Sequence, residues 1–199
     1  DSPKGPFKQI DKKPILVSEK AIDNSLFIDD DGTPYLTFVR FNDGNNIWVA
    51  EMEKDLITMK HETMRPCIRV TELWEEDLGR VTEGSFITKH NGIYYMTYSA
   101  NDFRSQAYGV GYATATSPFG PWTKYEKNPI LQKPAELVGV GHSAMFRDKD
   151  GQLKIVFHAH HDKENIHPRV MYIANVEFTD DETPKMKISE DIIYPKLIN

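Results

Sequence analysis

The sequence predicts an all-β fold of the β-propeller type, in which four-stranded antiparallel blades are arranged around a central axis. One observation behind this prediction is a pattern that occurs three times: an apolar strand, a tight turn that contains Gly, and a second strand rich in aromatic or β-branched residues. The turns carry Asp31-Gly32, Asn91-Gly92 and Asp150-Gly151, and such a pair between two apolar runs is a strong hairpin signal. The other observation is that no long segment has helical periodicity. Repeated short strands with Pro and Gly at the turns favour radially arranged blades.

Composition and charge limit the class of protein. The chain has 199 residues, of which 39% are apolar and 11% aromatic, enough for one ordinary core. Its net charge of −6 argues against a nucleic-acid partner, because phosphate contacts need a basic face. No apolar run approaches the roughly 18 residues of a membrane helix, so we expect no membrane partner. Cys67 is the single cysteine, which excludes an intrachain disulfide.

The strands of each predicted blade follow in order along the chain. Each hairpin is followed by a third apolar run and then by a weaker fourth strand, which completes a unit of about 60 residues. The hairpins begin near 22, 82 and 141, the third strands lie near 47–50, 110–114 and 170–174, and the fourth near 62–70, 121–126 and 184–190. The predicted blades therefore span about 20–75, 80–135 and 139–199.

Two segments outside the hairpins also resemble each other. Residues 2–16 and 117–131 share the pattern SPxGP…PIL. Because the second copy falls at the end of a blade, we expect residues 1–16 to form the last strand of a blade whose other strands are absent. The chain begins at Asp1-Ser2-Pro3, without Met or a signal peptide, so we expect a processed or excised product.

Three blades do not close a ring, because propellers use about four to eight. We therefore expect an incomplete propeller, a single partial domain over residues 1–199. The missing blades are one possible partner for the unpaired sides of this partial propeller. A second copy of the chain is another possible partner, because two copies of three blades could close a six-bladed ring and cover edge strands that otherwise invite aggregation.

Three polar residues recur at the start of the first strand of each predicted blade. Asp23, Glu83 and His142 are separated by 60 and 59 residues, and we interpret them as equivalent positions. In a propeller the first strand lines the axis, so the three side chains should converge on its mouth. The second strand runs back to the same mouth and ends at 40–42, 99–102 and 158–161 in the three blades.

Two carboxylates and a histidine around one mouth suit glycoside hydrolysis. One acid must stay protonated to donate to the leaving oxygen, and a second carboxylate nearby raises its pKa. We interpret Glu83 as the donor and Asp23 as the neighbour that adjusts its pKa and orients the sugar. The alternative is that each acid caps a strand or bonds backbone amides.

The motifs around these residues resemble glycoside hydrolase family 43. They are Ala21-Ile22-Asp23-Asn24-Ser25, Thr82-Glu83-Gly84-Ser85, and Gly139-Val140-Gly141-His142-Ser143, which occur in the family's order. The resemblance implies a five-bladed propeller with the activity of β-xylosidases, α-L-arabinofuranosidases and arabinanases, of which this chain would supply blades two to four. It implies a hydrolase of xylan or arabinan carbohydrate metabolism, secreted or periplasmic, with xylose or arabinose specificity and exo or endo action left open.

The resemblance also implies roles for the three residues. Glu83 matches the general acid, Asp23 the residue that modulates its pKa, and His142 a residue that helps to hold a calcium ion through water. No other cofactor is implied. Asn24 and Ser85 stand where the family usually has Pro. The family's general base is an Asp of the first blade, which has no match here.

Without that Asp, the chain lacks half of the catalytic pair. Inverting enzymes separate acid and base by roughly 6.5–9.5 Å to admit a water. We expect the chain alone to be inactive. The rival function from another class is a non-catalytic carbohydrate-binding propeller, which would need no acid.

Further candidates surround the predicted mouth. We expect sugar contacts from residues at the ends of the second strands and from one tryptophan before the strand of Glu83: Arg40, Phe41, Ser99, Asn101, His160 and Trp74. Trp74 could equally pack in the core. His158 and His160 share a strand face and could ligate zinc, although no third ligand is evident. Asp29-Asp30-Asp31-Gly32 is interpreted as a hairpin turn rather than a helix-flanked calcium loop, which would need Glu where Arg40 stands.

Overall fold

Three four-stranded antiparallel sheets make up the structure, a computed structural model that describes residues 4–8, 13–16 and 19–195. This confirms the predicted all-β class and the four-stranded blades. The first sheet contains β1 (Ala21–Ile28), β2 (Pro34–Phe41), β3 (Asn45–Glu51) and β4 (Arg65–Ile68). The second contains β5 (Thr82–His90), β6 (Ile93–Ala100), β7 (Gly109–Ala115) and β8 (Thr123–Lys124). The third contains β9 (Gly141–Arg147), β10 (Leu153–Ala159), β11 (Val170–Phe178) and β12 (Met186–Ile188).

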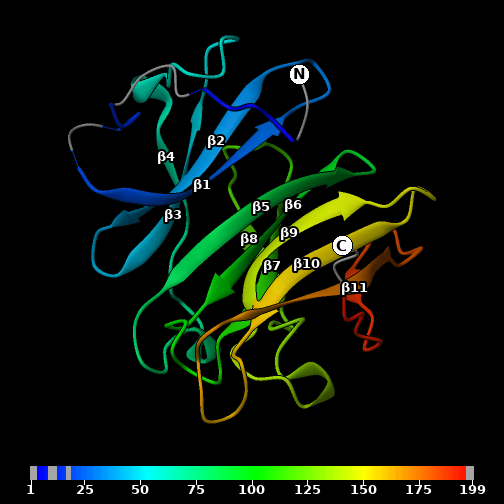
Figure 1. The fold of residues 1–199 in the computed structure, drawn as a ribbon. Helices are drawn as coiled ribbons and strands as arrows, with labels where there is room; N and C mark the ends of the chain where they lie inside the picture. The colour runs from blue at the N-terminus through cyan, green and yellow to red at the C-terminus, as the bar shows by residue number, and fades with distance from the viewer. Residues whose placement is uncertain (1–3, 9–12, 17–18, 196–199) are drawn as a thin grey trace.

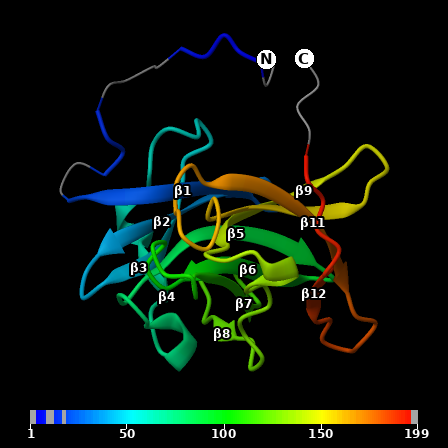
Figure 2. The ribbon, with the colours of Figure 1, turned by 60° about the horizontal axis from the view of Figure 1, so that its bottom comes forward.

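The strands follow one another within each sheet, so every sheet is a meander from an inner to an outer strand. The inner strands β1, β5 and β9 contact one another in that order and lie side by side in Figure 1. In Figure 2 the outer strands β4, β8 and β12 lie at the left, bottom and right of the molecule, so the sheets fan out from the inner strands. This is the arrangement of consecutive propeller blades.

Helices are short in the described residues. They are the single 3-10 turns η1 (His61–Thr63), η2 (Leu73–Glu75) and η3 (Pro134–Glu136). None of the helices in this part of the chain is long and apolar enough to cross a membrane.

Apolar side chains fill the spaces between neighbouring sheets. One cluster joins the first and second sheets through Val39, Ile47, Met96 and Tyr98. A larger cluster joins the second and third sheets. Its fully buried or nearly buried members include Tyr95, Val110, Tyr112, Ile155, Phe157 and Ala174. Because these side chains come from strands of two sheets, their burial fixes how the inner strands approach one another.

The expected strand at residues 1–16 is not present in the part that the structure describes. Residues 4–8 and 13–16 form no ladder, and the remainder of that prediction lies outside the described residues. A strand gains its stability from pairing with a neighbouring strand. Leu16 instead buries its side chain in the cluster around Leu36 and Phe38 on the first sheet.

Each inner strand has one irregularity at the same place. The pairing shifts between Ile22 and Ser25 in β1, between Glu83 and Phe86 in β5, and between Gly141 and Ala144 in β9. In every case two residues oppose one residue of the next strand, which is a β-bulge. The first bulge residue has a positive φ, and these residues are Asp23 (56°), Gly84 (57°) and His142 (50°).

The bulges correct the predicted equivalence of the three polar residues. By register, Asp23 and His142 match Gly84, whereas Glu83 is one residue earlier and matches Ile22 and Gly141. The similar spacings of 60 and 59 residues therefore suggested an alignment of these strands that is wrong by one position at Glu83. Spacing alone does not reveal which residue of each strand takes the left-handed conformation.

Candidate functional site

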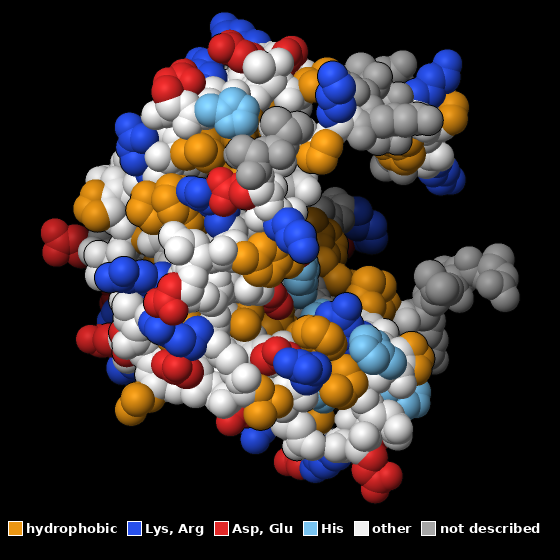
Figure 3. All heavy atoms as spheres, turned by 90° about the vertical axis from the view of Figure 1, so that its left-hand side faces the viewer, with side chains coloured by type: hydrophobic (Ala, Val, Ile, Leu, Met, Phe, Trp, Pro, Cys, Tyr) orange, Lys and Arg blue, Asp and Glu red, His pale blue; other side chains and the backbone are white. Residues whose placement is uncertain are grey.

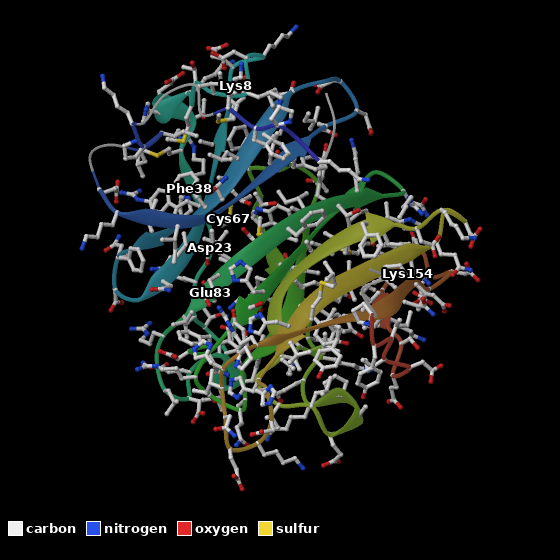
Figure 4. The ribbon with its side chains drawn as sticks, in the orientation of Figure 1. Lys8, Asp23, Phe38, Cys67, Glu83 and Lys154 are labelled. Atoms are coloured by element: carbon white, nitrogen blue, oxygen red, sulfur yellow. The ribbon has the colours of Figure 1, made fainter. Side chains whose placement is uncertain are left out.

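The starts of the three inner strands bring Asp23, Glu83 and His142 together. One ligand atom from each lies within 4.8 Å of the others. Figure 4 shows Asp23 and Glu83 on neighbouring strands at the same end of the sheets. The convergence expected from the sequence is present, even though Glu83 reaches the site from a position one residue earlier than its neighbours.

Gly84 allows this convergence. A Cβ atom at Gly84 would lie 3.1 Å from the Cα of His142, which is tighter than ordinary contacts. Its φ of 57° is also a conformation that glycine adopts without penalty. Glycine at the bulge therefore lets β5 and β9 approach closely enough for Glu83 and His142 to share one site.

Glu83 is held in a largely buried position by two neutral donors. Its residue is 9% exposed, Tyr108 donates its hydroxyl to Oε1 at 2.8 Å, and Asn45 donates Nδ2 to Oε2 at 3.2 Å. Burial raises the pKa of Glu83, and the negative charge of Asp23 raises it further, while the two hydrogen bonds and His142 act in the opposite direction. The carboxyl group therefore keeps a proton to higher pH than an ordinary glutamate.

Tyr108 was missed by the sequence-based reasoning. It is fully buried, and its ring lies directly against Gly141, where a Cβ atom would come within 2.1 Å of Cε1. The ring also stacks on His158 with a centroid distance of 5.8 Å. Gly141 occupies in the third sheet the register position that Glu83 has in the second, so the absence of a side chain there leaves room for the ring that supports Glu83.

Asn45 was also missed, although a sequence alignment of the three predicted blades could have identified both Asn45 and Tyr108. Asn45 opposes Phe41 at the entry to β3, and Tyr108 stands at the same register position before β7, because Gly109 opposes Ala100. Aligning the beginnings of the third strands, rather than only the first, would have singled out these two side chains.

Asp23 has one oxygen without a partner. Its Oδ2 is buried and accepts no hydrogen bond in the described part of the chain. A buried polar atom of this kind is costly unless a ligand, a water or an ion satisfies it. The oxygen is therefore available to a hydroxyl group or to a cation that enters the site.

The donor atoms of the three residues can be tested against a calcium ion. Calcium prefers oxygen ligands, and the unpartnered Oδ2 of Asp23 meets that requirement. Both oxygens of Glu83 already accept hydrogen bonds, and His142 offers nitrogen. Oδ2 of Asp23 is therefore the one unpartnered oxygen that these three residues offer a calcium ion, and they fit direct ligation by Glu83 poorly.

Among the expected sugar contacts, Arg40 and Phe41 are the last two residues of β2. Phe41 is 51% exposed at the end of β2. Arg40 is tied to Glu19 by an ion pair of 2.7 Å and lies over the ring of Trp48. Ser99 is buried and accepts a hydrogen bond from the backbone N–H of His142 at 2.7 Å, so it supports the site from behind.

Three other candidates serve the scaffold. Asn101 is buried, accepts from the backbone of Asp77 and donates to the carbonyl of Ala107, so it organises the loops around it. His160 is buried, and its Nε2 hydrogen-bonds to a backbone carbonyl at 2.8 Å. Trp74 packs on Tyr98 with a centroid distance of 5.9 Å, which supports the packing alternative that its sequence left open.

Neither the histidine pair His158 and His160 nor the Asp-rich segment 29–32 forms a metal site among the described residues. His158 lies beside Arg169 and His160 beside the carbonyl of Phe103, and among the described residues only the group of Asp23, Glu83 and His142 brings three metal-ligating side chains together. Asp29 to Gly32 form the turn between β1 and β2, as expected for a hairpin.

Figure 3 shows a hollow at one edge of the molecule, bordered by hydrophobic, histidine and acidic side chains. Converging polar groups and a carboxyl of raised pKa, as at Glu83, are typical of functional sites.

Comparison with known proteins agrees with this geometry. The sequence profile described as "Glycosyl hydrolases family 43" matches residues 1–184. A crystal structure of an endo-1,4-β-xylanase from Bacteroides thetaiotaomicron superimposes with a TM-score of 0.93 and 51% identity, covering 100% of this chain and 68% of the other. A thermostable family-43 glycoside hydrolase superimposes with a TM-score of 0.86 and 36% identity, covering 98% and 66% of the two chains.

Among curated proteins, a β-D-galactofuranosidase from Aspergillus niger is 30% identical over 160 residues. The match covers 78% of this chain and 43% of the relative. This chain therefore spans less than half the length of that relative.

Proposed function

The chain belongs to glycosyl hydrolase family 43, and from this premise we propose that it is the acid-bearing part of an inverting glycoside hydrolase acting on xylan- or arabinan-type polysaccharides or their oligomers. The observation that carries the proposal is Glu83: a buried carboxyl of raised pKa, held by two neutral donors beside a second carboxylate. The substrate class is supported by the solved relative named as an endo-1,4-β-xylanase.

In this mechanism Glu83 donates its proton to the glycosidic oxygen as the bond to the anomeric carbon breaks. Tyr108 and Asn45 hold the carboxyl in one orientation, while burial and the charge of Asp23 raise its pKa and so favour the protonated form. The unpartnered Oδ2 of Asp23 accepts a hydrogen bond from a sugar hydroxyl. Water attacks from the opposite face, and its proton leaves to a general base, so the product has the inverted configuration.

The general base remains the part of the proposal that rests on the resemblance alone. We propose that it is an Asp from a blade outside this chain, and that the 199-residue chain alone is inactive. Xylosidase or arabinofuranosidase activity of the purified chain, abolished by Glu83→Gln, would overturn this point.

A chimera tests the function directly. In it, this chain replaces the matching segment of the Bacteroides thetaiotaomicron endo-1,4-β-xylanase, which supplies the remainder of the propeller. The proposal predicts hydrolysis of xylan or arabinan oligomers with an inverted anomer in the first product, detected by proton NMR. A folded chimera that binds these oligomers but hydrolyses none would instead favour a carbohydrate-binding module, and there Glu83→Ala would leave affinity unchanged.

Calcium and self-association are separate proposals. We propose that a calcium ion, when bound, screens the carboxylates near the axis, with His142 reaching it through water. Chelation by EDTA should then lower the melting temperature, and added calcium should restore it. The edge strand β1 exposes Ile22, Leu26 and Ile28, so light scattering of the chain at high concentration tests whether two copies associate. Secretion or a periplasmic location agrees with a polymeric substrate.

A further inference from the structure

The first and second sheets are joined by an ionic clamp at the end of the sheets that lies opposite Glu83. Lys89, near the end of β5, pairs with Asp29 at 2.7 Å and with Asp30 at 2.8 Å. Tyr94 opposes Lys89 on β6 and donates its hydroxyl to the same Asp29. The clamp therefore closes the junction between the turn after β1 and the hairpin of β5 and β6.

The junction between the second and third sheets carries other residues at the corresponding places. Counted from the bulge of each inner strand, His90 stands where the first junction has Asp29. Arg147 stands in the same way where that junction has Lys89. Arg147 thus has no carboxylate at the place where Lys89 has one, and the second junction lacks the clamp.

The residues at this second junction have other contacts and leave a cavity between the sheets. The ring of His90 stacks on Phe178 with a centroid distance of 4.0 Å, and Arg147 donates Nη1 to the carbonyl of Gly151 in its own hairpin at 2.9 Å. Leu153 stands where the clamp has its tyrosine and offers no hydroxyl. All five residues line a cavity of about 630 Å³, which lies within the roughly 300–1,000 Å³ of typical ligand sites.

Hydrogen-bonding groups that the protein does not use line the same cavity. The side-chain oxygens of Gln152 and Asn175 accept from Lys154, so their amide N–H groups remain for a ligand. In the described part of the chain the side-chain amide of Asn91 has no hydrogen-bond partner, and Asp180 is an exposed acceptor. The cavity therefore offers both donors and acceptors.

This lining matches a neutral sugar chain better than it matches other classes of ligand. A sugar ring has C–H groups that pack on an aromatic face, and hydroxyl groups that both donate and accept. The stacked rings of His90 and Phe178 supply the aromatic surface. Among the described lining residues, the acids Glu177, Asp180 and Asp181 face a single arginine, which disfavours an anion. An apolar ligand would leave the amides unpaired.

We propose that this cavity is a second glycan-binding site, which holds a neutral xylan- or arabinan-type chain away from Glu83. The proposal rests on the proposed function for the choice of polysaccharide. His90 lies seven positions after Glu83 on β5, a separation of roughly 23 Å at about 3.3 Å per residue. In Figure 4 Lys154, which follows Leu153, lies at the opposite end of the sheets from Glu83. The second site would therefore hold a polymer without contacting the bond that Glu83 cleaves.

The test is an NMR titration of the nitrogen-15-labelled 199-residue chain with xylohexaose and, separately, with arabinohexaose. The proposal predicts saturable shifts of the backbone amide signals of Asn91, Gly151 and Gln152 with at least one of the two sugars, with a Kd on the order of 1 mM or tighter. Glu83→Gln should leave these shifts unchanged, because Glu83 lies at the other end of β5.

Two variants of lining residues assign the shifts to the cavity. His90→Ala removes one of the stacked rings, and Gln152→Ala removes an amide donor from an exposed turn. Each should weaken binding by about fivefold, and Gln152→Ala keeps the test valid if His90→Ala does not fold. His61→Ala is the matched control, because His61 is an exposed histidine of η1 and should leave the Kd unchanged.

The outcomes separate the second site from the proposed function. Shifts confined to residues around Glu83 would overturn the second site and leave the proposed function standing. Shifts at the cavity alone would support the second site and count against the proposed function. Shifts at neither place would count against both. An unchanged Kd in folded His90→Ala and Gln152→Ala variants would also contradict the second site.

Discussion

Two buried glutamates, Glu75 and Glu83, lie eight residues apart and have opposite surroundings. Glu75 is fully buried, forms an ion pair with Lys124 at 2.6 Å, and accepts from the hydroxyl of Tyr98 and from two backbone N–H groups. Glu83 also accepts from a tyrosine, Tyr108, but among the described residues no cation is in hydrogen-bond contact with it, and it faces a second carboxylate instead. A cation therefore balances the charge of one glutamate, whereas burial and a neighbouring carboxylate raise the pKa of the other.

This difference distinguishes a carboxylate that stabilises the fold from one that is suited to transfer a proton. The partners of Glu75 join the η2 turn to β8 and stabilise its charge. The surroundings of Glu83 raise its pKa, and its neighbour His142 is exposed. Burial by itself identifies neither role, because both residues are buried and both are bonded to a tyrosine.

The largest expected effect on activity comes from Glu83→Gln in the chimera. Loss of a general acid lowers turnover by about 10³-fold. The variant should remain folded, since the raised pKa of Glu83 means that its charged form costs stability as pH rises through that pKa. Turnover on an unactivated oligosaccharide measures the loss of activity, and the melting temperature shows whether the variant is folded. Turnover within a factor of two of the unaltered chimera would contradict the contrast between Glu83 and Glu75.

Glu75→Gln should lower the stability of the protein and leave the turnover of its folded fraction unchanged. It leaves the ammonium group of Lys124 largely buried without its anion, which costs about 3–5 kcal/mol of unfolding free energy. Urea unfolding of the 199-residue chain measures this loss. The folded fraction of the corresponding chimera should keep its turnover per molecule, and a selective loss of turnover without a loss of stability would place Glu75 in the chemistry.

Asp23→Asn sharpens the account of the raised pKa. Removal of the neighbouring negative charge lowers the pKa of Glu83, so the high-pH limit of activity should move to lower pH. Turnover should fall by about tenfold or more, because a misplaced or prematurely ionised acid loses much of its effect. A pH–rate profile of the chimera measures both, and an unchanged high-pH limit would contradict the proposed influence of Asp23.

The smallest effects come from the two tyrosines. Tyr108→Phe removes a hydrogen bond that favours the charged form of Glu83, so the high-pH limit should move upward, and turnover should fall by about tenfold or less. Tyr98→Phe is the matched control, since it removes a bond to Glu75 and should lower stability by about 1–2 kcal/mol without moving the pH profile. If the high-pH limit shifts by the same amount in both variants, the shift reflects a general loss of structural stability and not the pKa of Glu83.

The repeat in the sequence was enough to predict the sheets and the meeting of Asp23, Glu83 and His142. It could not predict their register, because the bulge falls on Asp23, Gly84 and His142, and only backbone conformation distinguishes Glu83 from Gly84. The convergence survived this error because a one-residue difference at a bulge still leaves the side chain at the same end of the strand.

The burial and hydrogen-bond partners of the other candidates could not be predicted, because the sequence does not contain them. Asn101 and His160 stand at the predicted mouth, yet backbone groups of neighbouring loops occupy their hydrogen-bonding atoms. Trp74 belongs to the packing between two sheets. Tyr108 could be selected only by aligning the starts of the third strands, and the space for its ring depends on the missing side chain of Gly141 in the next sheet.

The most direct test is a carbon-13 NMR titration of the Glu83 carboxyl in the purified 199-residue chain, which needs no turnover. The account predicts a pKa above the ordinary glutamate value of about 4.3, a further rise in Tyr108→Phe and a fall in Asp23→Asn. A pKa at or below the ordinary value in the folded wild-type chain would contradict the assignment of Glu83 as the proton donor.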